Sequence, residues 1–351
     1  MVRQIVEEAS FLGLLARIIA AGMAWVACSV AAAQAPADHP NITQLDPHQV
    51  VGHEACAKCH ASEVATWKAT PHHTTFQQLH QKKEAAEIAK KMGITSIKRG
   101  QICIDCHYTA QDVEGTVKAI SGVSCESCHG AAEKWVKQHG DYGGPSITKL
   151  TETPAHRQQR FNQSIALGMH NPHNLYLMAQ SCLKCHTVPN EKLVNVGGHK
   201  AGSLEFEMVA WSQGMVRHNF LESNGKVNAL LDQNRLRVLY VSGMIAELEF
   251  SLRATAEATE KATYGFTSAQ RADKAVKRIK ELAPQLNLPI FQEIVDTTSG
   301  VKLKLNNRPQ LVAAADKIAT LGIRFATEIK GEQLAVVDGL LPAPGKYKNG
   351  K

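Results

Sequence analysis

Cysteine, histidine and tryptophan are absent from Asn219 to Lys351, although the whole chain holds nine cysteines and sixteen histidines. Apart from Cys28, every cysteine lies between residues 56 and 185, and every histidine lies between residues 39 and 218. Two compositions in one chain predict two domains with a boundary near residue 220. We expect one domain over 36–220, a second over 221–335 and a flexible tail over 336–351.

Aromatic residues make up only 5% of the 351 residues, which is little for the core of a chain of this length. Beyond residue 35 no apolar run is long enough to span a bilayer, which excludes a membrane protein with several spanning helices. The chain is nevertheless 44% hydrophobic and 20% charged, so we expect a folded globular protein and not a disordered one.

The N-terminus carries a long apolar run, residues 18–33, which follows Arg17. The run ends in the small residues AAAQA, so we expect a signal peptide over 1–35, cleaved after Ala33 or Ala35. An uncleaved anchor helix and a lipid on Cys28 are the alternatives, and either would associate the protein with a membrane. In each case the bulk of the chain is exported, which predicts a periplasmic location.

The eight cysteines beyond Cys28 form four pairs, and each pair is followed at once by a histidine. The pairs read CAKCH at 56–60, CIDCH at 103–107, CESCH at 125–129 and CLKCH at 182–186. C-x-x-C-H is the attachment sequence of c-type haem, because two thiols three residues apart can add to the two vinyl groups at one porphyrin edge. Zinc ribbons also use C-x-x-C pairs, but they need no histidine after every pair.

The repeated motif predicts a tetrahaem c-type cytochrome with four covalently bound haem c groups. We assign haem attachment to Cys56, Cys59, Cys103, Cys106, Cys125, Cys128, Cys182 and Cys185, and the proximal iron positions to His60, His107, His129 and His186. Four porphyrins are large apolar bodies, which accounts for the low aromatic content. Their propionates add about eight negative charges to a formal charge of +7, so the basic composition is no evidence for nucleic-acid binding.

The sixth position of each iron has twelve candidate histidines, the sixteen in the chain less the four in the motifs. Methionine in that position would raise the reduction potential, whereas a second histidine keeps it lower. The density of histidines favours several bis-histidine sites. Spacing alone does not choose among the candidates.

Four stretches around the motifs resemble the cytochrome c-554 family and follow one another in the family's order. They are WKATPH at 67–72, GVSCESCHG at 122–130, VGGH at 196–199 and LEFE at 204–207. The resemblance covers about residues 50–220.

The resemblance implies roles for several histidines. His72 resembles the distal ligand of the third haem, and His139 resembles the distal ligand of the first. After the third motif, Ala131-Ala132 stands where the family often has Gly-Pro. We expect His199 to serve the fourth haem, with His218 as the alternative. The second haem lacks a distal side chain in the family, so it should be five-coordinate here.

The expected fold is mainly α, with short motif helices and long loops around four haems, plus a C-terminal helical bundle. Helices are expected over 82–91, 226–261, from 267 or 268 to before 284, 289–300 and 307–331. The bundle has no cysteine or histidine to bind a metal. It is expected to cap the haem domain, form a homo-oligomer or dock a partner.

Electron transfer is the favoured function, with the protein as a carrier and no catalytic residue. The resemblance implies a redox partner such as the multihaem hydroxylamine oxidoreductase of nitrogen metabolism. The alternative is a reductase acting on nitric oxide or a related species at an open second haem. Lys98, Arg99, Asp105 and Tyr108 flank that motif, but they are expected to be ordinary solvated residues. A polymerising extracellular wire is a third hypothesis.

Overall fold

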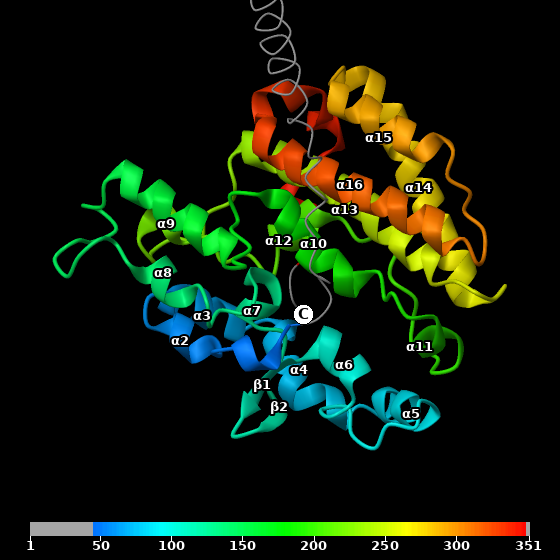
Figure 1. Ribbon diagram of the computed structural model, residues 1–351, viewed down its shortest axis with the longest axis horizontal. Helices are drawn as coiled ribbons and strands as arrows, with labels where there is room; N and C mark the ends of the chain where they lie inside the picture. Colours follow the sequence, from blue (N-terminus) through cyan, green and yellow to red (C-terminus); the bar gives the residue numbers. More distant parts are fainter. Residues whose placement is uncertain (1–44, 349–351) are drawn as a thin grey trace, which may run out of the picture. The chain divides into compact units, whose positions relative to one another are not determined.

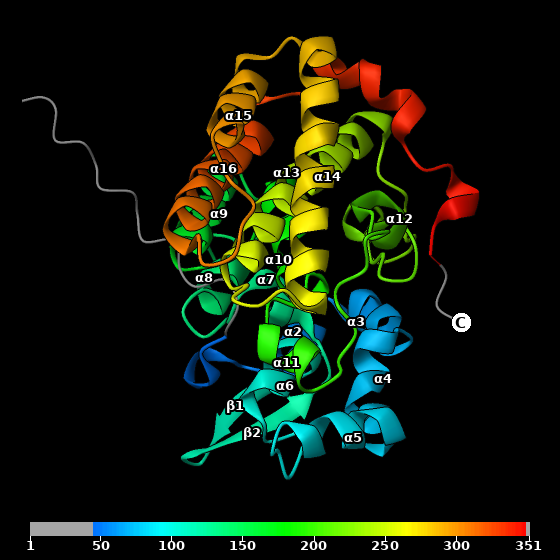
Figure 2. The same cartoon turned by 90° about the vertical axis from the view of Figure 1, so that its right-hand side faces the viewer.

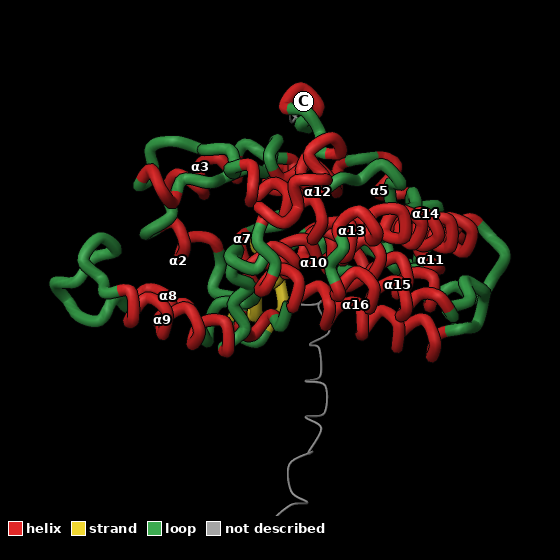
Figure 3. Tube along the Cα trace, turned by 90° about the horizontal axis from the view of Figure 1, so that it is seen from above, coloured by secondary structure: helices red, strands yellow, loops and turns green. Residues whose placement is uncertain are grey.

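The computed structural model describes residues 45–348, so the signal peptide expected over 1–35 lies outside the described residues. The described chain is built mainly of helices, as predicted, and the tube in Figure 3 shows helices and loops almost throughout. Among residues 45–348, no helix combines the length and apolar character that a bilayer span needs.

Short helices joined by loops make up the part of the chain that carries the four motifs (Figure 1). They are η1 (Pro47–Gln49), α2 (His53–Ala57), α3 (Ala61–Lys68), α4 (Pro71–Gln78), η2 (Leu79–Gln81), α5 (Lys83–Lys91), α6 (Gln101–His107), α7 (Cys125–His129), α8 (Val136–Gly140), α9 (Pro154–Ala166), α10 (Leu175–His186), α11 (Glu191–Asn195), α12 (Met208–Ser212) and η3 (Leu221–Ser223).

A β-hairpin between α6 and α7 is a feature that the sequence analysis missed. Strands β1 (Thr109–Val113) and β2 (Thr116–Ser121) pair antiparallel, with Val113 opposite Thr116. Glu114 and Gly115 both have positive φ, at 55° and 77°, which is the backbone of a two-residue hairpin turn. The strands show no clear alternation of buried and exposed residues, which is why no strand was expected.

Long helices form the C-terminal part: α13 (Gln233–Ala256), α14 (Thr263–Leu286), α15 (Pro289–Ser299) and α16 (Arg308–Glu328). Figure 2 shows α13 and α14 beside α15 and α16, and α13 packs directly against α14 and α16. Helix α14 begins earlier than expected because Asn195 of α11 accepts a hydrogen bond from the Tyr264 amide, 3.0 Å away, at its first turn. This capping contact comes from a distant segment and has no local sequence signal.

One hydrophobic core extends across residue 220. It joins Leu175, Tyr176 and Leu183 of α10 and Met208 of α12 to the helices of the bundle. A Cβ on Gly322 of α16 would lie 2.2 Å from the Tyr176 ring, so the absence of a side chain allows α10 to pack closely. The fourth haem motif therefore sits on a helix that the bundle holds.

The expected flexible tail over 336–351 is packed as far as Lys348. Helix η4 (Gly331–Leu340) lies on α13, where the carboxylate of Asp338 pairs with Arg237 at 2.6 Å. Val337 is fully buried, and a further short helix, η5 (Pro344–Lys346), follows. Leu334, Val337 and Leu341 contact the bundle core, which orders a segment that was expected to be a tail.

Candidate haem-binding sites

Each C-x-x-C-H motif lies on or at the end of a short helix. Helices α6, α7 and α10 end at the motif histidines His107, His129 and His186, and the first motif runs from α2 to the start of α3 at His60. Residues three apart lie on one face of a helix, so each helix presents both thiols and the following imidazole to one side. This is the geometry that attachment to one porphyrin edge requires.

The four motifs lie next to one another in a definite order. Helix α2 of the first motif packs against α7 of the third, and the Cys185 thiol of the fourth motif lies 3.8 Å from the Asp105 carbonyl of the second. Helices α7 and α10 also pack together, and Ser181 of α10 donates to the Cys128 carbonyl at 2.8 Å. The motifs therefore follow one another in space as first, third, fourth, second.

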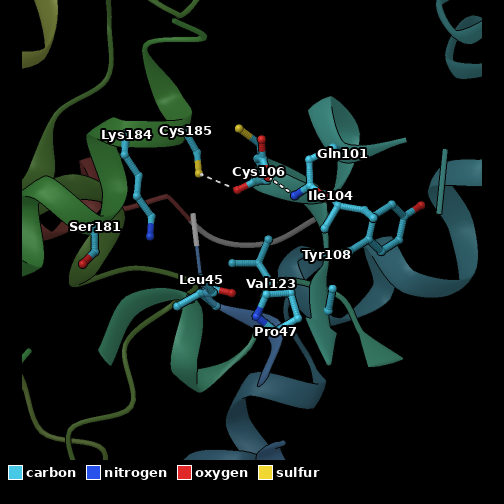
Figure 4. A pocket seen from close by; sticks show the side chains of 13 residues that line it. Leu45, Pro47, Gln101, Ile104, Cys106, Tyr108, Val123, Ser181, Lys184 and Cys185 are labelled. Carbon is cyan, nitrogen blue, oxygen red and sulfur yellow. Dashed lines mark hydrogen bonds between the residues drawn. The ribbon is translucent and has the colours of Figure 1, made fainter. Parts of the chain in front are cut away.

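A pocket lies between the second and fourth motifs (Figure 4). Its lining comes from α6, α10 and the chain near residue 45, and it includes Cys106, Tyr108, Lys184 and Cys185. The Cys185 thiol points across the pocket at the Asp105 carbonyl, 3.8 Å away. The second and fourth motifs therefore line one shared space.

Every motif histidine faces one histidine from outside the motifs. The four pairs and their ring-centre distances are His60–His139 at 6.2 Å, His107–His199 at 6.2 Å, His129–His218 at 6.2 Å and His186–His72 at 6.5 Å. A metal between two imidazoles holds the ring centres about 6 Å apart, since each metal–nitrogen bond is about 2 Å long. Four separate pairs share the spacing that bis-histidine iron requires.

Hydrogen bonds at the other ring nitrogen fix the tautomer of three paired histidines. The Nδ1 atoms of His199 and His218 each lie 2.7 Å from a backbone carbonyl, and that of His129 lies 3.2 Å from the His170 carbonyl. A carbonyl only accepts, so Nδ1 carries the hydrogen and donates. The Nε2 lone pair is then left for a metal, as in most histidine-ligated sites.

Burial favours the uncharged form of five of the eight paired imidazoles. It lowers the pKa of His107, His129, His139 and His186 to about 4 in each case, and it also lowers the pKa of His72. A histidine with such a pKa is neutral at pH 7, which is the form that binds a metal.

Several buried donors beside the paired histidines have no hydrogen-bond acceptor within the described chain. They include the indole Nε1 of Trp135, near His139, and of Trp211, near His186, together with Tyr108 Oη and Arg217 Nε. Buried donors without acceptors are rare in folded proteins. Ionised propionates would supply acceptors here, so the residues fit haem.

The pairing differs from the expected assignment at three of the four motifs. His139 lies beside His60, the pairing expected for the first haem. His72, however, faces His186 of the fourth motif instead of the third, and His199 faces His107 of the second instead of the fourth. His218, the alternative for the fourth haem, faces the third motif.

The expectation of an open second haem does not fit this arrangement, because His199 occupies the position opposite His107. The flanking residues do not gather there as a catalytic group. Lys98 lies over the Phe76 ring at 3.8 Å, and the Tyr108 side chain packs with Phe76 in a small apolar cluster. His173, another histidine outside the assigned set, lies against Phe161 and not against a motif histidine.

The stretches that resemble the cytochrome c-554 family interlock in the structure. The Trp67 indole donates to the Val123 carbonyl at 2.7 Å. A Cβ on Gly122 would lie 2.0 Å from the His72 carbonyl oxygen, so only glycine lets these two segments meet. Glu126 is 1% exposed and accepts hydrogen bonds from the amides of Val51, Gly52 and Ala132. These residues therefore fix the first motif against the third.

A buried ion pair supports His139 and carried no signal in the sequence. Arg160 of α9 donates to both carboxylate oxygens of Glu152 at 2.7 Å and to the His139 carbonyl at 2.6 Å. The guanidinium holds the pKa of Glu152 at about 2. This pair ties α8, which carries His139, to α9.

Part of the chain is similar to known proteins. Residues 55–130 match the family model described as cytochrome c554 and c-prime. An alignment over 111 positions, which takes in 29% of this chain, shows 29% identity to cytochrome c-554 of Nitrosomonas europaea. It covers 47% of that relative, so the chain spans about half of its length. No solved structure matches. The resemblance to the cytochrome c-554 family is therefore confirmed, and it extends over part of the chain.

Proposed function

We propose that the protein is a periplasmic tetrahaem c-type cytochrome that carries electrons between redox partners. The observation that carries the proposal is the set of four histidine pairs, each with one motif histidine and a ring-centre distance of 6.2 to 6.5 Å. Each pair would hold one haem iron from both faces, and the eight motif cysteines would attach the porphyrins. Haem supplies reversible one-electron chemistry when it is bound.

The chain's own residues favour electron transfer over bond chemistry. Two imidazoles on opposite sides would leave no open coordination position, and a second histidine keeps the reduction potential lower than methionine would. The motifs also lie in an unbroken spatial series, from the first through the third and fourth to the second. A series of neighbouring sites suits a carrier with separate points of electron entry and exit.

The reductase alternative has less support. It needs an open iron, and His199 lies opposite His107 at the very motif where an open site was expected. Catalysis would also need acids or donors placed beside the open face. Lys98 and Tyr108 instead make the aromatic and apolar contacts described above.

The partner assignment rests on the resemblance alone. A multihaem oxidoreductase such as hydroxylamine oxidoreductase would be the electron donor, which would place the protein in nitrogen metabolism. Export through the N-terminal segment would bring the chain to the compartment where haem c is attached. The exposed outer faces of the C-terminal helices would be the surface for a homo-oligomer.

The test is a haem count and an electron paramagnetic resonance spectrum of the purified, oxidised holoprotein. We expect four covalent haems per chain, low-spin signals only, and no nitric oxide adduct after reduction. The His129–His218 rings are 89° apart and the His60–His139 rings 20° apart, so one strongly anisotropic and one rhombic low-spin signal are expected. A high-spin haem that binds nitric oxide would contradict the carrier and support the reductase.

A further inference from the structure

The last described residues fold back onto the segment that carries His218. We call residues 341–348 the C-terminal strap. It follows η4 and, in Figure 2, descends in red beside α12. Residues 213–218 leave the end of α12 and lead to His218, which faces the motif histidine His129 at 6.2 Å.

Two backbone hydrogen bonds join the strap to this segment. The Met215 amide donates to the Lys348 carbonyl at 2.6 Å, and the Lys348 amide donates to the Ala210 carbonyl at 2.9 Å. Gly214 lies between them, and a Cβ there would be 2.2 Å from the Lys348 carbonyl oxygen and 2.7 Å from its nitrogen. The strap therefore meets Gly214 backbone to backbone, with no room for a side chain.

The strap is held at its other end by the bundle. Leu341 and Tyr347 pack against the main hydrophobic core, and Val337 in the preceding η4 is fully buried there. Asp338 of η4 pairs with Arg237 of α13 at 2.6 Å. The strap is thus a short tether between a rigid helix and the backbone three residues before His218.

The residues between the tether and His218 form a tight, hydrogen-bonded turn. The Arg217 amide donates to the Gly214 carbonyl at 3.2 Å, and its side chain donates to the Gln213 carbonyl at 2.8 Å. The His218 Nδ1 lies 2.7 Å from the Val216 carbonyl, which sets the direction of the imidazole. Gly214 and Met215 are therefore joined to the imidazole through a short, hydrogen-bonded stretch of backbone, whose far side is held by Asn228 through the Arg217 carbonyl and the Asn219 amide.

We infer that the C-terminal strap positions His218 as the distal ligand of the third haem. The inference rests on the proposed function, since it takes the His129–His218 pair as an iron site. The segment that follows the bundle would thus act on the third haem, although the motif for that haem lies outside the bundle. Release of the strap would open the third iron to a small neutral ligand such as carbon monoxide.

Three variants of the holoprotein test this positioning role. A chain ending at Leu340 lacks the strap, and Gly214→Ala keeps the full chain but places a methyl group against Lys348. Gly345→Ala is the matched control, because a Cβ there meets nothing within 4 Å. The readouts are carbon monoxide binding per reduced haem and the low-spin signal of the near-perpendicular pair, with a haem count to verify maturation.

We expect no carbon monoxide binding by the wild type or by Gly345→Ala. The truncated chain and Gly214→Ala should bind about one carbon monoxide per four haems and lose the strongly anisotropic signal. Wild-type spectra in both variants would contradict the inference that the strap positions His218. Carbon monoxide binding by the wild type would instead contradict the proposed function. If the truncated chain does not accumulate, Gly214→Ala decides the test. Lys348→Pro then serves as the second variant, because it removes only the backbone hydrogen bond to Ala210.

Discussion

The bundle and the motif region bury their apolar side chains in different ways. The bundle has one large core with fully buried side chains such as Leu248, Leu252, Phe291 and Phe325. The motif region has separate small clusters, one of which consists of Ala132, Trp135 and Met169. Two of its buried polar donors without acceptors, the indole nitrogens of Trp135 and Trp211, lie beside paired histidines. A core of side chains can form by itself, whereas the motif region requires bound groups to complete its interior.

Production of the chain without haem should reveal the largest difference between the two regions. A chain produced without haem attachment should keep the helices of the bundle and lose ordered structure over the motif region, because small clusters do not offset the entropy of ordering long loops. Limited proteolysis and hydrogen exchange, compared with the holoprotein, would locate the loss. Equal protection of residues 50–170 in both forms would show that the region folds without haem.

The substitution Phe291→Ala should have the next largest effect. Phe291 is fully buried, and its ring lies 5.9 Å from that of Phe325, in edge-to-face contact. Removing a buried phenylalanine ring costs about 3–5 kcal/mol of unfolding free energy. Denaturant unfolding followed by circular dichroism would measure this loss, while the low-spin haem signals should stay unchanged. Phe266→Ala is the matched control, since its side chain is 67% exposed.

The substitution Glu152→Gln should destabilise the motif region by about 3 kcal/mol, because it leaves the buried Arg160 guanidinium without its charge partner. In the wild type the pKa of Glu152 is depressed from 4.5 to about 2. Its contribution is therefore complete above pH 4.5 and is lost as the pH falls towards 2. Acid unfolding should show this component in the wild type, and it should be missing in the variant.

The substitution His199→Ala should change stability least, by about 1 kcal/mol, and yet change one haem completely. It removes the imidazole opposite His107, so one haem of four should become high-spin and bind nitric oxide. His173→Ala is the control, because that ring lies against Phe161. Unchanged low-spin spectra in the His199 variant would show that another side chain closes the second iron.

The motif residues could be predicted from the sequence because their spacing is local. A thiol, a second thiol three residues later and an adjacent histidine follow from the geometry of one helical turn. The histidine partners follow from the packing of distant segments. His72 is twelve residues from His60, yet it faces His186, because Gly122 and Trp67 fix α4 in a place that no spacing encodes.

The helices of the bundle were predicted for a similar reason. Their apolar periodicity lies within each helix, although α13 spans Gln233–Ala256 and not the expected 226–261. The misses arose where another segment decides the structure. Asn195 caps the first turn of α14, and the core orders the chain from η4 to Lys348. Glu152 and Arg160 are eight residues apart and form an ion pair beneath His139, which no sequence motif predicts.

Helix α10 has a consequence for how such a chain can be assembled in evolution. Its last turn carries the fourth motif, while Tyr176 and Leu183 on the same helix are sealed by α13 and α16. Removal of the bundle at residue 220 would uncover these side chains. A shorter relative without a bundle should therefore carry polar residues at the positions of Tyr176, Ala179 and Leu183. Gain or loss of the bundle would have required compensating changes along the helix that carries the fourth motif.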